Sequence, residues 1–156
     1  MKRYILDTNV FNRVLDGVVE LPSPTSGVGY YATHVQLDEL AATSDQGRRA
    51  ALLATFSSIG PETLPTESLV LDVSRIGFAK LGDGVLYSEL STELDSRNGG
   101  KPNNVHDALI AESAIMTGLN LVTEDKDLLQ IVSQHGGLSV RIGDIDVSGS
   151  SGAPQL

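Results

Sequence analysis

Short apolar runs alternate with longer segments of helical periodicity along the chain, and this alternation restricts the fold more than any other feature. The runs predicted as strands are Tyr4–Leu6, Gly29–Thr33, Ser68–Val73, Asn120–Thr123 and Leu138–Ile142. Strands that alternate with helices are typical of an α/β domain whose sheet is largely parallel. We therefore expect an α/β fold with a central, mostly parallel sheet flanked by helices.

Helix signals lie between the predicted strands. A first helix is expected to begin at Thr8 or Asn9 and to end near Gly17. The residues THVQ, positions 33–36, have the form of a capping box, so they predict the start of a second helix. The other predicted helices are Gln46–Ile59, a weak one over Ser74–Leu81, Val85–Arg97, and one from Asn103 or Asn104 to Gly118.

The length and composition favour one ordinary domain. The chain has 156 residues, and we place the domain at residues 1–147, with the Gly- and Ser-rich residues 148–156 predicted as a flexible tail. The absence of cysteine excludes disulfides and thiolate metal sites. The first apolar run is too short for a secretory signal, and no window approaches a membrane span. We expect a soluble, cytoplasmic protein with no membrane partner.

The charge balance is strongly acidic. A net charge of −9 and a pI near 4.6 argue against a nucleic-acid-binding protein, which normally carries a basic surface. The argument weakens if several acids surround metal ions, because the formal charge then overstates the negative field that a substrate meets. The placement of the acids therefore matters more than their number.

Four acids occupy positions where a parallel sheet would bring them together. In open α/β sheets, ligands bind outside the carboxyl ends of the strands. Asp7 and Asp125 each follow a predicted strand, while Glu39 and Asp107 lie on helices that can close over the same edge. If the strands that precede Asp7 and Asp125 are neighbours, the four carboxylates converge.

A cluster of four carboxylates needs a compensating charge. Mutual repulsion would raise some of their pKa values or separate the side chains, whereas a divalent cation would neutralise them. Carboxylate oxygens without cysteine or clustered histidine suit Mg²⁺ or Mn²⁺. The chemistry that follows most directly is metal-assisted attack of water on a phosphodiester.

Three segments resemble the signature regions of the PIN domain, and especially of VapC-like toxins from bacterial toxin–antitoxin pairs. They read YILDTNVF from Tyr4, THVQLDELA from Thr33, and NVHDALIAESAIMTGLNLVTEDKDL from Asn104. The resemblance covers nearly all of the chain up to about residue 146. It implies a PIN-like three-layer sandwich. It also implies a Mg²⁺- or Mn²⁺-dependent endoribonuclease that is bound by a small antitoxin protein and frequently forms a homodimer.

The resemblance also implies roles for individual residues. The predicted catalytic residues and metal ligands are Asp7, Glu39, Asp107 and Asp125, with Asp127 as an additional metal ligand. The predicted substrate-binding residues are Thr8, Asn9 and Thr123, which match polar positions of the family, and Lys101, which precedes the Asp107 helix and could reach a phosphate.

Each of these residues also has an ordinary structural interpretation. Asp7 could cap a helix, and Asp107 could simply favour the dipole of its helix. Asp125 and Asp127 could form an acidic turn that caps a helix over Lys126–Val132. Glu39 could be solvated, and the two threonines could satisfy local backbone groups. His34, His106 and His135 fit no metal motif and are interpreted as surface or packing residues.

Two functional alternatives stay open. The acidic charge and the few basic residues would also suit a PIN-fold protein that binds or acts as a scaffold with little or no catalysis. A nuclease that acts on DNA or structured nucleic acid would carry the same four acids. The apolar helix face around Leu52, Leu53 and Phe56 is expected to belong to the core, and part of it could be a groove for an antitoxin helix.

Overall fold

The predicted alternation of strands and helices forms a parallel sheet that is covered on both faces. The computed structural model describes residues 1–74 and 77–146, so the predicted tail over residues 148–156 lies outside the described residues. The strands are β1 (Lys2–Leu6), β2 (Val28–Thr33), β3 (Glu62–Leu64), β4 (Asn120–Val122) and β5 (Leu138–Val140). The helices are α1 (Thr8–Leu15), α2 (His34–Ala41), α3 (Gln46–Ile59), α4 (Val85–Asn98), α5 (Asn104–Thr117) and α6 (Lys126–Gln134), with short 3₁₀ turns at Pro24–Ser26 and Ile142–Asp144.

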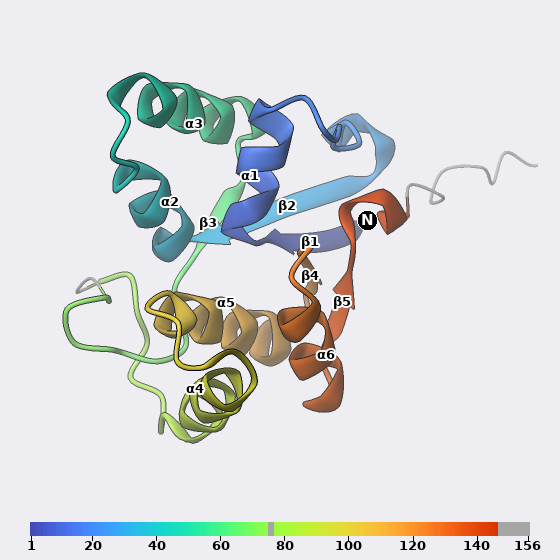
Figure 1. The fold of residues 1–156 in the computed structure, drawn as a ribbon. Coiled ribbons are helices and arrows are strands. Elements are labelled where there is room, and N and C mark those ends of the chain that lie inside the picture. Colours follow the sequence, from blue (N-terminus) through green and yellow to red (C-terminus); the bar gives the residue numbers. More distant parts are fainter. Residues whose placement is uncertain (75–76, 147–156) are drawn as a thin grey trace, which may run out of the picture.

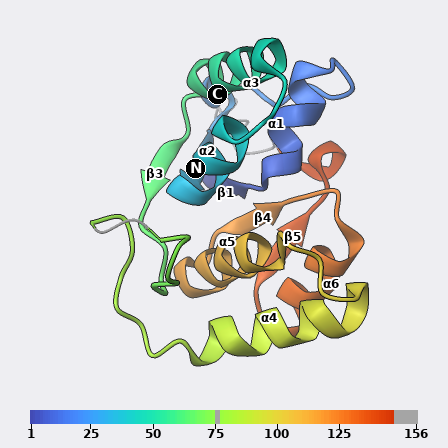
Figure 2. The same cartoon turned by 60° about the vertical axis from the view of Figure 1, so that its left-hand side comes forward.

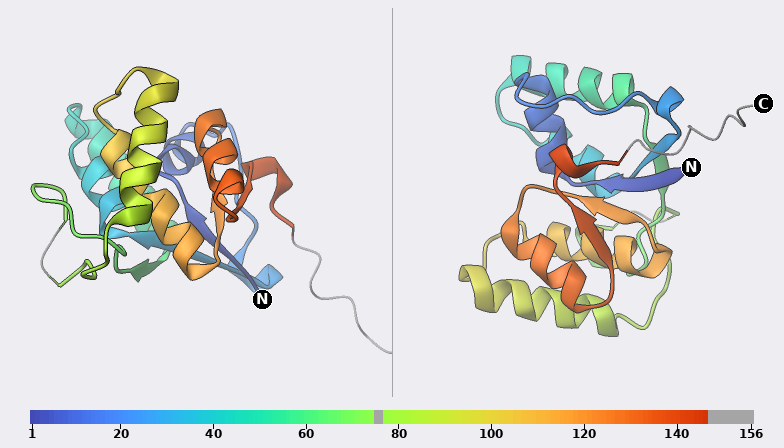
Figure 3. Two further views of the ribbon diagram at one scale, coloured as in Figure 1. Left: turned by 90° about the horizontal axis from the view of Figure 1, so that it is seen from below. Right: turned by 90° about the vertical axis from the view of Figure 1, so that its right-hand side faces the viewer.

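The elements form three layers. Figure 1 shows α1, α2 and α3 on one side of the sheet and α4, α5 and α6 on the other, and Figure 2 shows the same arrangement after a rotation. In the right-hand view of Figure 3 the sheet lies between the two helical layers. The predicted PIN-like α/β sandwich is therefore confirmed.

The order of the strands creates a switch point between β1 and β4. The sheet order is β3-β2-β1-β4-β5, and all neighbouring strands are parallel. The chain leaves β1 toward one edge of the sheet through β2 and β3, and then returns to the other side of β1 through β4 and β5. At such a point the connections diverge and leave a crevice outside the carboxyl ends of the two central strands.

Strand β1 is buried on both faces, which explains its continuous apolar sequence. Ile5 packs into the core on the side of α4, α5 and α6, while Tyr4 and Leu6 pack into the core on the side of α1 and α3. Phe11 of α1 also contacts Phe56 of α3, with their ring centroids 5.1 Å apart. Burial of such a side chain stabilises the fold by about 1.5–3 kcal/mol. The two cores therefore hold β1 firmly from both faces of the sheet.

The start of α2 follows the predicted capping box. The backbone N–H of Thr33 donates to Gln36 Oε1 at 2.9 Å, and the Thr33 hydroxyl accepts from the N–H of Val35 at 3.2 Å. Gln36 Nε2 also donates to the carbonyl oxygen of Leu6 at 2.9 Å. This last bond ties α2 to the end of β1, close to Asp7. The prediction of α3 over Gln46–Ile59 is also confirmed.

Two predictions in the central segment are wrong. Ser68–Val73 is not a strand, because the N–H groups of Val73 and Ser74 donate back to the carbonyl of Val70 and close a turn. Asp72 has a φ of 67°, which no extended strand allows. The third strand is instead Glu62–Leu64, which pairs with β2. The weak helix over Ser74–Leu81 is also absent from the described part of that segment, where Ala79 forms an isolated bridge with Thr66.

None of the helices within residues 1–74 and 77–146 combines the length and the apolar character required to cross a bilayer.

Candidate active site

An acidic cavity lies at the switch point of the sheet. Its volume is 220 Å³, and its walls contain all four of the predicted carboxylates. The lining residues are Asp7, Thr8, Asn9, Asn12, Glu39, Asn103, Asp107 and Asp125. They come from α1, α2, α5 and the ends of β1 and β4, segments that are far apart in the sequence. The parallel sheet therefore brings together the side chains that the strand-end argument selected.

Asp7 is held rigidly at the end of β1. Its Oδ1 accepts from the N–H of Thr8 at 2.7 Å, so it is the N-cap of α1. Its Oδ2 accepts from the Thr123 hydroxyl at 2.6 Å and from Asn9 Nδ2 at 2.8 Å. The side chain is only 3% exposed, and this burial raises the pKa of Asp7 to about 6 despite the hydrogen bonds. Asp7 therefore caps α1 and also lines the acidic cavity, and its role as a catalytic residue and metal ligand stays a prediction.

Asp107 has the most strongly raised pKa of the cavity's carboxylates. It is 7% exposed, and burial together with the charges of Asp7, Glu39 and Asp125 raises its pKa to about 8. Within the described residues its carboxylate accepts a single, long hydrogen bond of 3.3 Å, from Asn103 Nδ2. An acid in this environment is partly protonated at neutral pH unless a cation compensates it.

Glu39 has a partner that the sequence did not suggest. His106 Nδ1 lies 2.5 Å from Glu39 Oε1, and this hydrogen bond raises the pKa of His106. The interpretation of His106 as a mere surface or packing residue therefore missed its contact with the site. Its position next to Asp107 in the sequence was the only available signal.

Asp125 has two roles at the start of α6. Its Oδ1 accepts from the N–H groups of Asp127 and Leu128, at 2.8 and 3.1 Å, so it caps the helix. It also lines the acidic cavity. The Asp127 side chain is not part of the cavity wall, and Asp127 contributes its backbone N–H to the cap. Its assignment as a metal ligand stays a prediction.

Thr123 connects the ends of the two central strands. The residue is fully buried, and its hydroxyl accepts from the N–H of Asp125 at 3.0 Å and from Asn9 Nδ2 at 3.2 Å while it donates to Asp7. The structure thus places Thr123 behind the cavity, whereas Thr8 and Asn9 lie in its wall. Lys101 lies outside the wall, but its charge lowers the pKa of Asp107.

Two asparagines of the wall were not predicted as site residues. Asn12 and Asn103 both line the cavity. Asn12 lies one helical turn after Thr8 on α1, and Asn103 lies one turn before Asp107, so helical spacing could have identified both.

The donors of the cavity fit a hard divalent cation. All of its possible ligands are carboxylate, amide or hydroxyl oxygens, the set that Mg²⁺ and Mn²⁺ prefer. Two buried oxygens of the wall, Thr8 Oγ1 and Asn9 Oδ1, find no hydrogen-bond partner among residues 1–74 and 77–146. As placed, no three His, Asp or Glu side chains of the described residues form a group that could hold an ion. Coordination would therefore need side-chain rotation or bridging waters, which Mg²⁺ usually retains.

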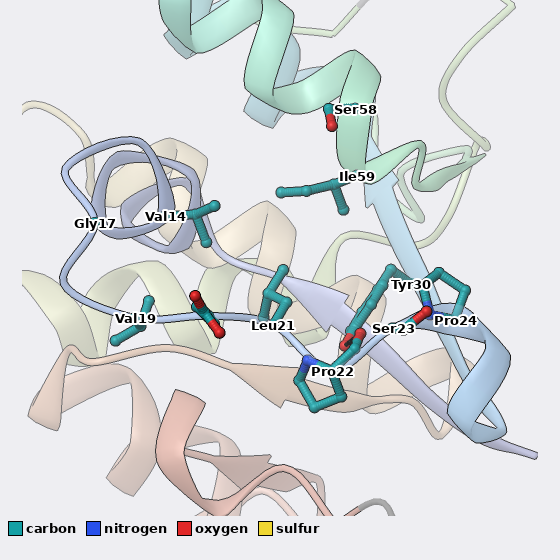
Figure 4. Close-up of a pocket in the computed structure, with 11 residues that line it drawn as sticks. Val14, Gly17, Val19, Leu21, Pro22, Ser23, Pro24, Tyr30, Ser58 and Ile59 are labelled. Carbon is teal, nitrogen blue, oxygen red and sulfur yellow. Dashed lines mark hydrogen bonds between the residues drawn. The ribbon is translucent and has the colours of Figure 1, made fainter.

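A second hollow lies at the opposite end of α1. Its volume is 410 Å³, and Figure 4 shows its lining, which includes Val14, Leu21, Tyr30 and Ile59. A neighbouring cavity between α1 and α3 shares Val14 and Ile59 with it. Neither cavity has a wall residue in common with the acidic cavity, so they provide a separate, largely apolar surface.

Known structures share this fold. No family model and no curated protein matches the sequence. A chain of the VapBC2 complex from Rickettsia felis, bound to a DNA fragment from its promoter, has a TM-score of 0.56 at 20% identity, over 89% of this chain and 98% of that chain. A VapBC-5 chain from Mycobacterium tuberculosis has a TM-score of 0.48 at 19% identity, over 90% and 99% of the two chains. A chain of FitAcB from Neisseria gonorrhoeae has a TM-score of 0.48 at 15% identity, over 91% and 99%.

The Rickettsia felis match establishes a shared fold, and at such low identity it establishes no more. Together, the fold and the cavity define a PIN-like α/β domain with four carboxylates at its switch point.

Proposed function

We propose that the chain is a metal-dependent endoribonuclease that hydrolyses RNA phosphodiester bonds. The observation that carries this proposal is the convergence of Asp7, Glu39, Asp107 and Asp125 on one small cavity. Burial raises the pKa of Asp7 and of Asp107, and the charges of the neighbouring carboxylates raise both further. A protein that keeps such a destabilising cluster gains most from it when a cation binds there.

The four acids would hold Mg²⁺ or Mn²⁺ directly or through water. When bound, the ion supplies Lewis acidity, which neutralises charge on the phosphate and makes water a stronger nucleophile. Asp7 is already oriented for this role by Thr123 and Asn9, which hold its Oδ2. Glu39 is oriented in a similar way by His106.

The reaction consumes one water molecule for each bond that is cut. The oxygen of a water molecule forms a bond to phosphorus, one ester P–O bond breaks, and the leaving oxygen takes up a proton from solvent. One of the four carboxylates accepts the proton of the attacking water.

The biological role that we propose is the toxin of a toxin–antitoxin pair, acting in the cytoplasm. The fold is shared with a chain of the Rickettsia felis VapBC2 complex, which supports this role. The apolar cavities beside α1 and α3 offer a surface on which an amphipathic antitoxin helix could dock. Homodimerisation is a further expectation, which follows from the resemblance to the family.

Cleavage of labelled RNA tests the proposal. We expect the wild-type chain to cut single-stranded RNA with Mn²⁺ or Mg²⁺, and to lose activity in EDTA or after the substitution Asp7→Asn. Glu62→Gln is a matched control, because it also removes one acidic charge but lies on the exposed surface of β3. Equal cleavage by the wild type and Asp7→Asn would refute the mechanism. A single-stranded DNA of the same sequence shows whether the substrate is RNA or DNA.

One observation favours a binding protein with weak catalysis as a second candidate. The acids of the described residues, as placed, do not form a group that could hold an ion. Calorimetric titration with Mn²⁺ at neutral pH separates the two candidates. A bound ion with no cleavage would leave the nuclease without support, and the absence of any metal binding would favour the scaffold.

A further inference from the structure

A second polar cavity, which we call the α6–β5 groove, lies along α6 and the edge strand β5. Its volume is 550 Å³, and it is lined by Lys126, Leu129, Gln130, Ser133, Gln134, Ser139 and Arg141. The α6 residues recur at helical spacing and so form one face of the helix, while Ser139 and Arg141 are two residues apart and point to one side of β5. In Figure 1 α6 and β5 lie side by side, which their packing confirms.

The groove has the opposite charge to the rest of the chain. No Asp or Glu lines it within the described residues, although the sequence contains 20 acidic residues. Lys126 and Arg141 are both exposed, so their charges face the solvent at little desolvation cost. Arg141 also forms an ion pair with Glu124 at 3.8 Å, which leaves other N–H groups of the half-exposed guanidinium available to a ligand.

The two glutamines of the groove are oriented so that they present donors. Arg97 of α4 donates to Gln130 Oε1 at 2.7 Å and to Gln134 Oε1 at 2.8 Å. A guanidinium can only donate, so the oxygen of each amide must face Arg97 and the Nε2 group must point elsewhere. No described residue accepts a hydrogen bond from these Nε2 groups. The groove therefore combines two cations with two free amide donors, which suits an anionic ligand.

The groove begins beside the acidic cavity. Lys126 directly follows Asp125 in the sequence. The N–H of Thr123 donates to the carbonyl of Val140 at 3.1 Å, so Arg141 leaves β5 at the same carboxyl edge of the sheet where the four acids lie. A polyanion whose scissile phosphate occupied the acidic cavity could continue into the groove. The nine residues of α6 span about 13 Å, enough for a few nucleotides of one strand.

We propose that the α6–β5 groove binds the sugar–phosphate backbone of single-stranded RNA next to the bond that is cut. This inference rests on the function proposed above and identifies where its substrate runs. No aromatic side chain lines the groove within the described residues, so base stacking does not contribute and the contacts go to phosphate oxygens. Binding by the groove is therefore independent of base sequence.

The test is RNA binding in EDTA, which prevents cleavage. Fluorescence anisotropy with a labelled single-stranded RNA compares the wild-type chain with the double variant Lys126→Gln/Arg141→Gln. We expect the dissociation constant to rise about tenfold, equally for uridine-rich and adenosine-rich RNA. The slope of its logarithm against the logarithm of salt concentration should fall by about 1.4, the value for two lost phosphate contacts on a single strand.

Two further variants control for charge and for folding. Arg3→Gln removes an exposed cation from the amino end of β1, opposite the cavity, and should change the dissociation constant by less than about twofold. Gln130→Glu/Gln134→Glu keeps acceptors for Arg97 but replaces both free donors with anions. It should weaken RNA binding about tenfold or more while the melting temperature stays near that of the wild type.

The outcomes separate the two proposals. If the double variant at Lys126 and Arg141 binds RNA like Arg3→Gln, with the same salt slope, the groove does not bind the backbone, whatever the chain cleaves. If the groove variants lose binding as expected while the wild type fails to cut RNA with Mn²⁺, the groove stands and the nuclease activity does not.

Discussion

Two cavities with opposite charge lie next to each other at the start of α6, where Asp125 lines one and Lys126 lines the other. The acidic cavity of 220 Å³ contains Asp125 and three further carboxylates, and the α6–β5 groove of 550 Å³ begins at the next residue, Lys126, and contains no carboxylate within the described residues. A chain with a net charge of −9 thus separates its charges at the edge of the sheet. The overall charge, which argued against nucleic acid, says little about the surface that a substrate would meet.

The charges of the two cavities also differ in how much they destabilise the folded chain. Asp7 and Asp107 are almost fully buried, so their burial and mutual repulsion oppose folding when they are ionised. Lys126 and Arg141 are exposed and cost little. The acidic cavity should therefore be sensitive to single substitutions, to pH and to metal, whereas the groove should be sensitive mainly to salt.

The largest loss of RNA cleavage is expected from substitution of Asp125, the cavity residue next to the groove. Asp125→Asn should lower RNA cleavage by about a thousandfold, because it removes one of the charges that would hold the ion. Asp127→Asn, two residues later, should lower it by less than about tenfold, because the Asp127 side chain does not line the cavity.

Asparagine caps helices as well as aspartate does, so both variants should keep the stability of α6. Initial rates with Mn²⁺, together with melting temperatures, check this pair. Similar losses in both variants would show that Asp127 is also a ligand and would extend the acidic site into α6.

A smaller effect is expected behind the cavity, at Thr123. Thr123→Val removes the hydroxyl that donates to Asp7 and accepts from the N–H of Asp125, and leaves buried polar groups unpaired. We expect a loss of about 1–3 kcal/mol in unfolding free energy and a 10- to 100-fold weaker affinity for Mn²⁺.

Thr123→Ser keeps the hydroxyl and serves as the control. Denaturant titration and Mn²⁺ calorimetry on the two variants separate a lost contact from a lost methyl group. If Thr123→Ser lost as much unfolding free energy and Mn²⁺ affinity as Thr123→Val, the hydroxyl would not be the feature that positions Asp7.

The pH dependence of stability should expose the strain of the acidic cavity. The ordinary pKa of an aspartate is 3.8, and burial raises the pKa of Asp7 to about 6 and that of Asp107 to about 8. The folded, metal-free chain then binds protons more tightly than the unfolded chain. Their contribution to stability is therefore complete below pH 3.8 and is lost as the pH rises toward 8.

Asp107→Asn should remove the larger part of the stability that the metal-free chain loses as the pH rises. At pH 8 and without metal, its melting temperature should exceed that of the wild type by about 4–8 °C, which corresponds to about 2 kcal/mol. Addition of Mn²⁺ should stabilise the wild type and leave the variant unchanged. A variant that melted below the wild type in EDTA would show that Asp107 is satisfied without a cation.

The smallest effect is expected at the rim, at His106. His106→Leu removes the hydrogen bond to Glu39 Oε1, but both side chains are partly exposed, so we expect only a fewfold loss of cleavage rate. His106→Gln keeps a donor and should restore part of the rate. A loss as large as that of Asp125→Asn would give His106 a direct part in the chemistry.

The sequence predicted the acidic cavity better than it predicted the central segment. Asp7 and Asp125 follow strands whose apolar runs are unmistakable, and the parallel topology then requires that they meet. The hydroxyl and amide contacts of Thr123 and Asn9 depend on side-chain directions, which no spacing rule gives.

The prediction for the central segment was wrong for a physical reason. The run at Ser68–Val73 is as apolar as a buried strand, but its chain reverses at Asp72, where φ is 67°. The true edge strand, Glu62–Leu64, is short and largely exposed, so it carries almost no hydrophobic signal. Edge strands of this kind are fixed by pairing with their neighbour, here β2, and not by their own side chains.

The most direct test of the central claim is the anomalous scattering of a crystal soaked in Mn²⁺. The account predicts a manganese peak inside the acidic cavity, with oxygens of Asp7, Glu39, Asp107 or Asp125 around it, directly or through water, and no such peak in crystals of Asp7→Asn. Four carboxylates that kept their metal-free positions around a cavity without manganese would contradict it.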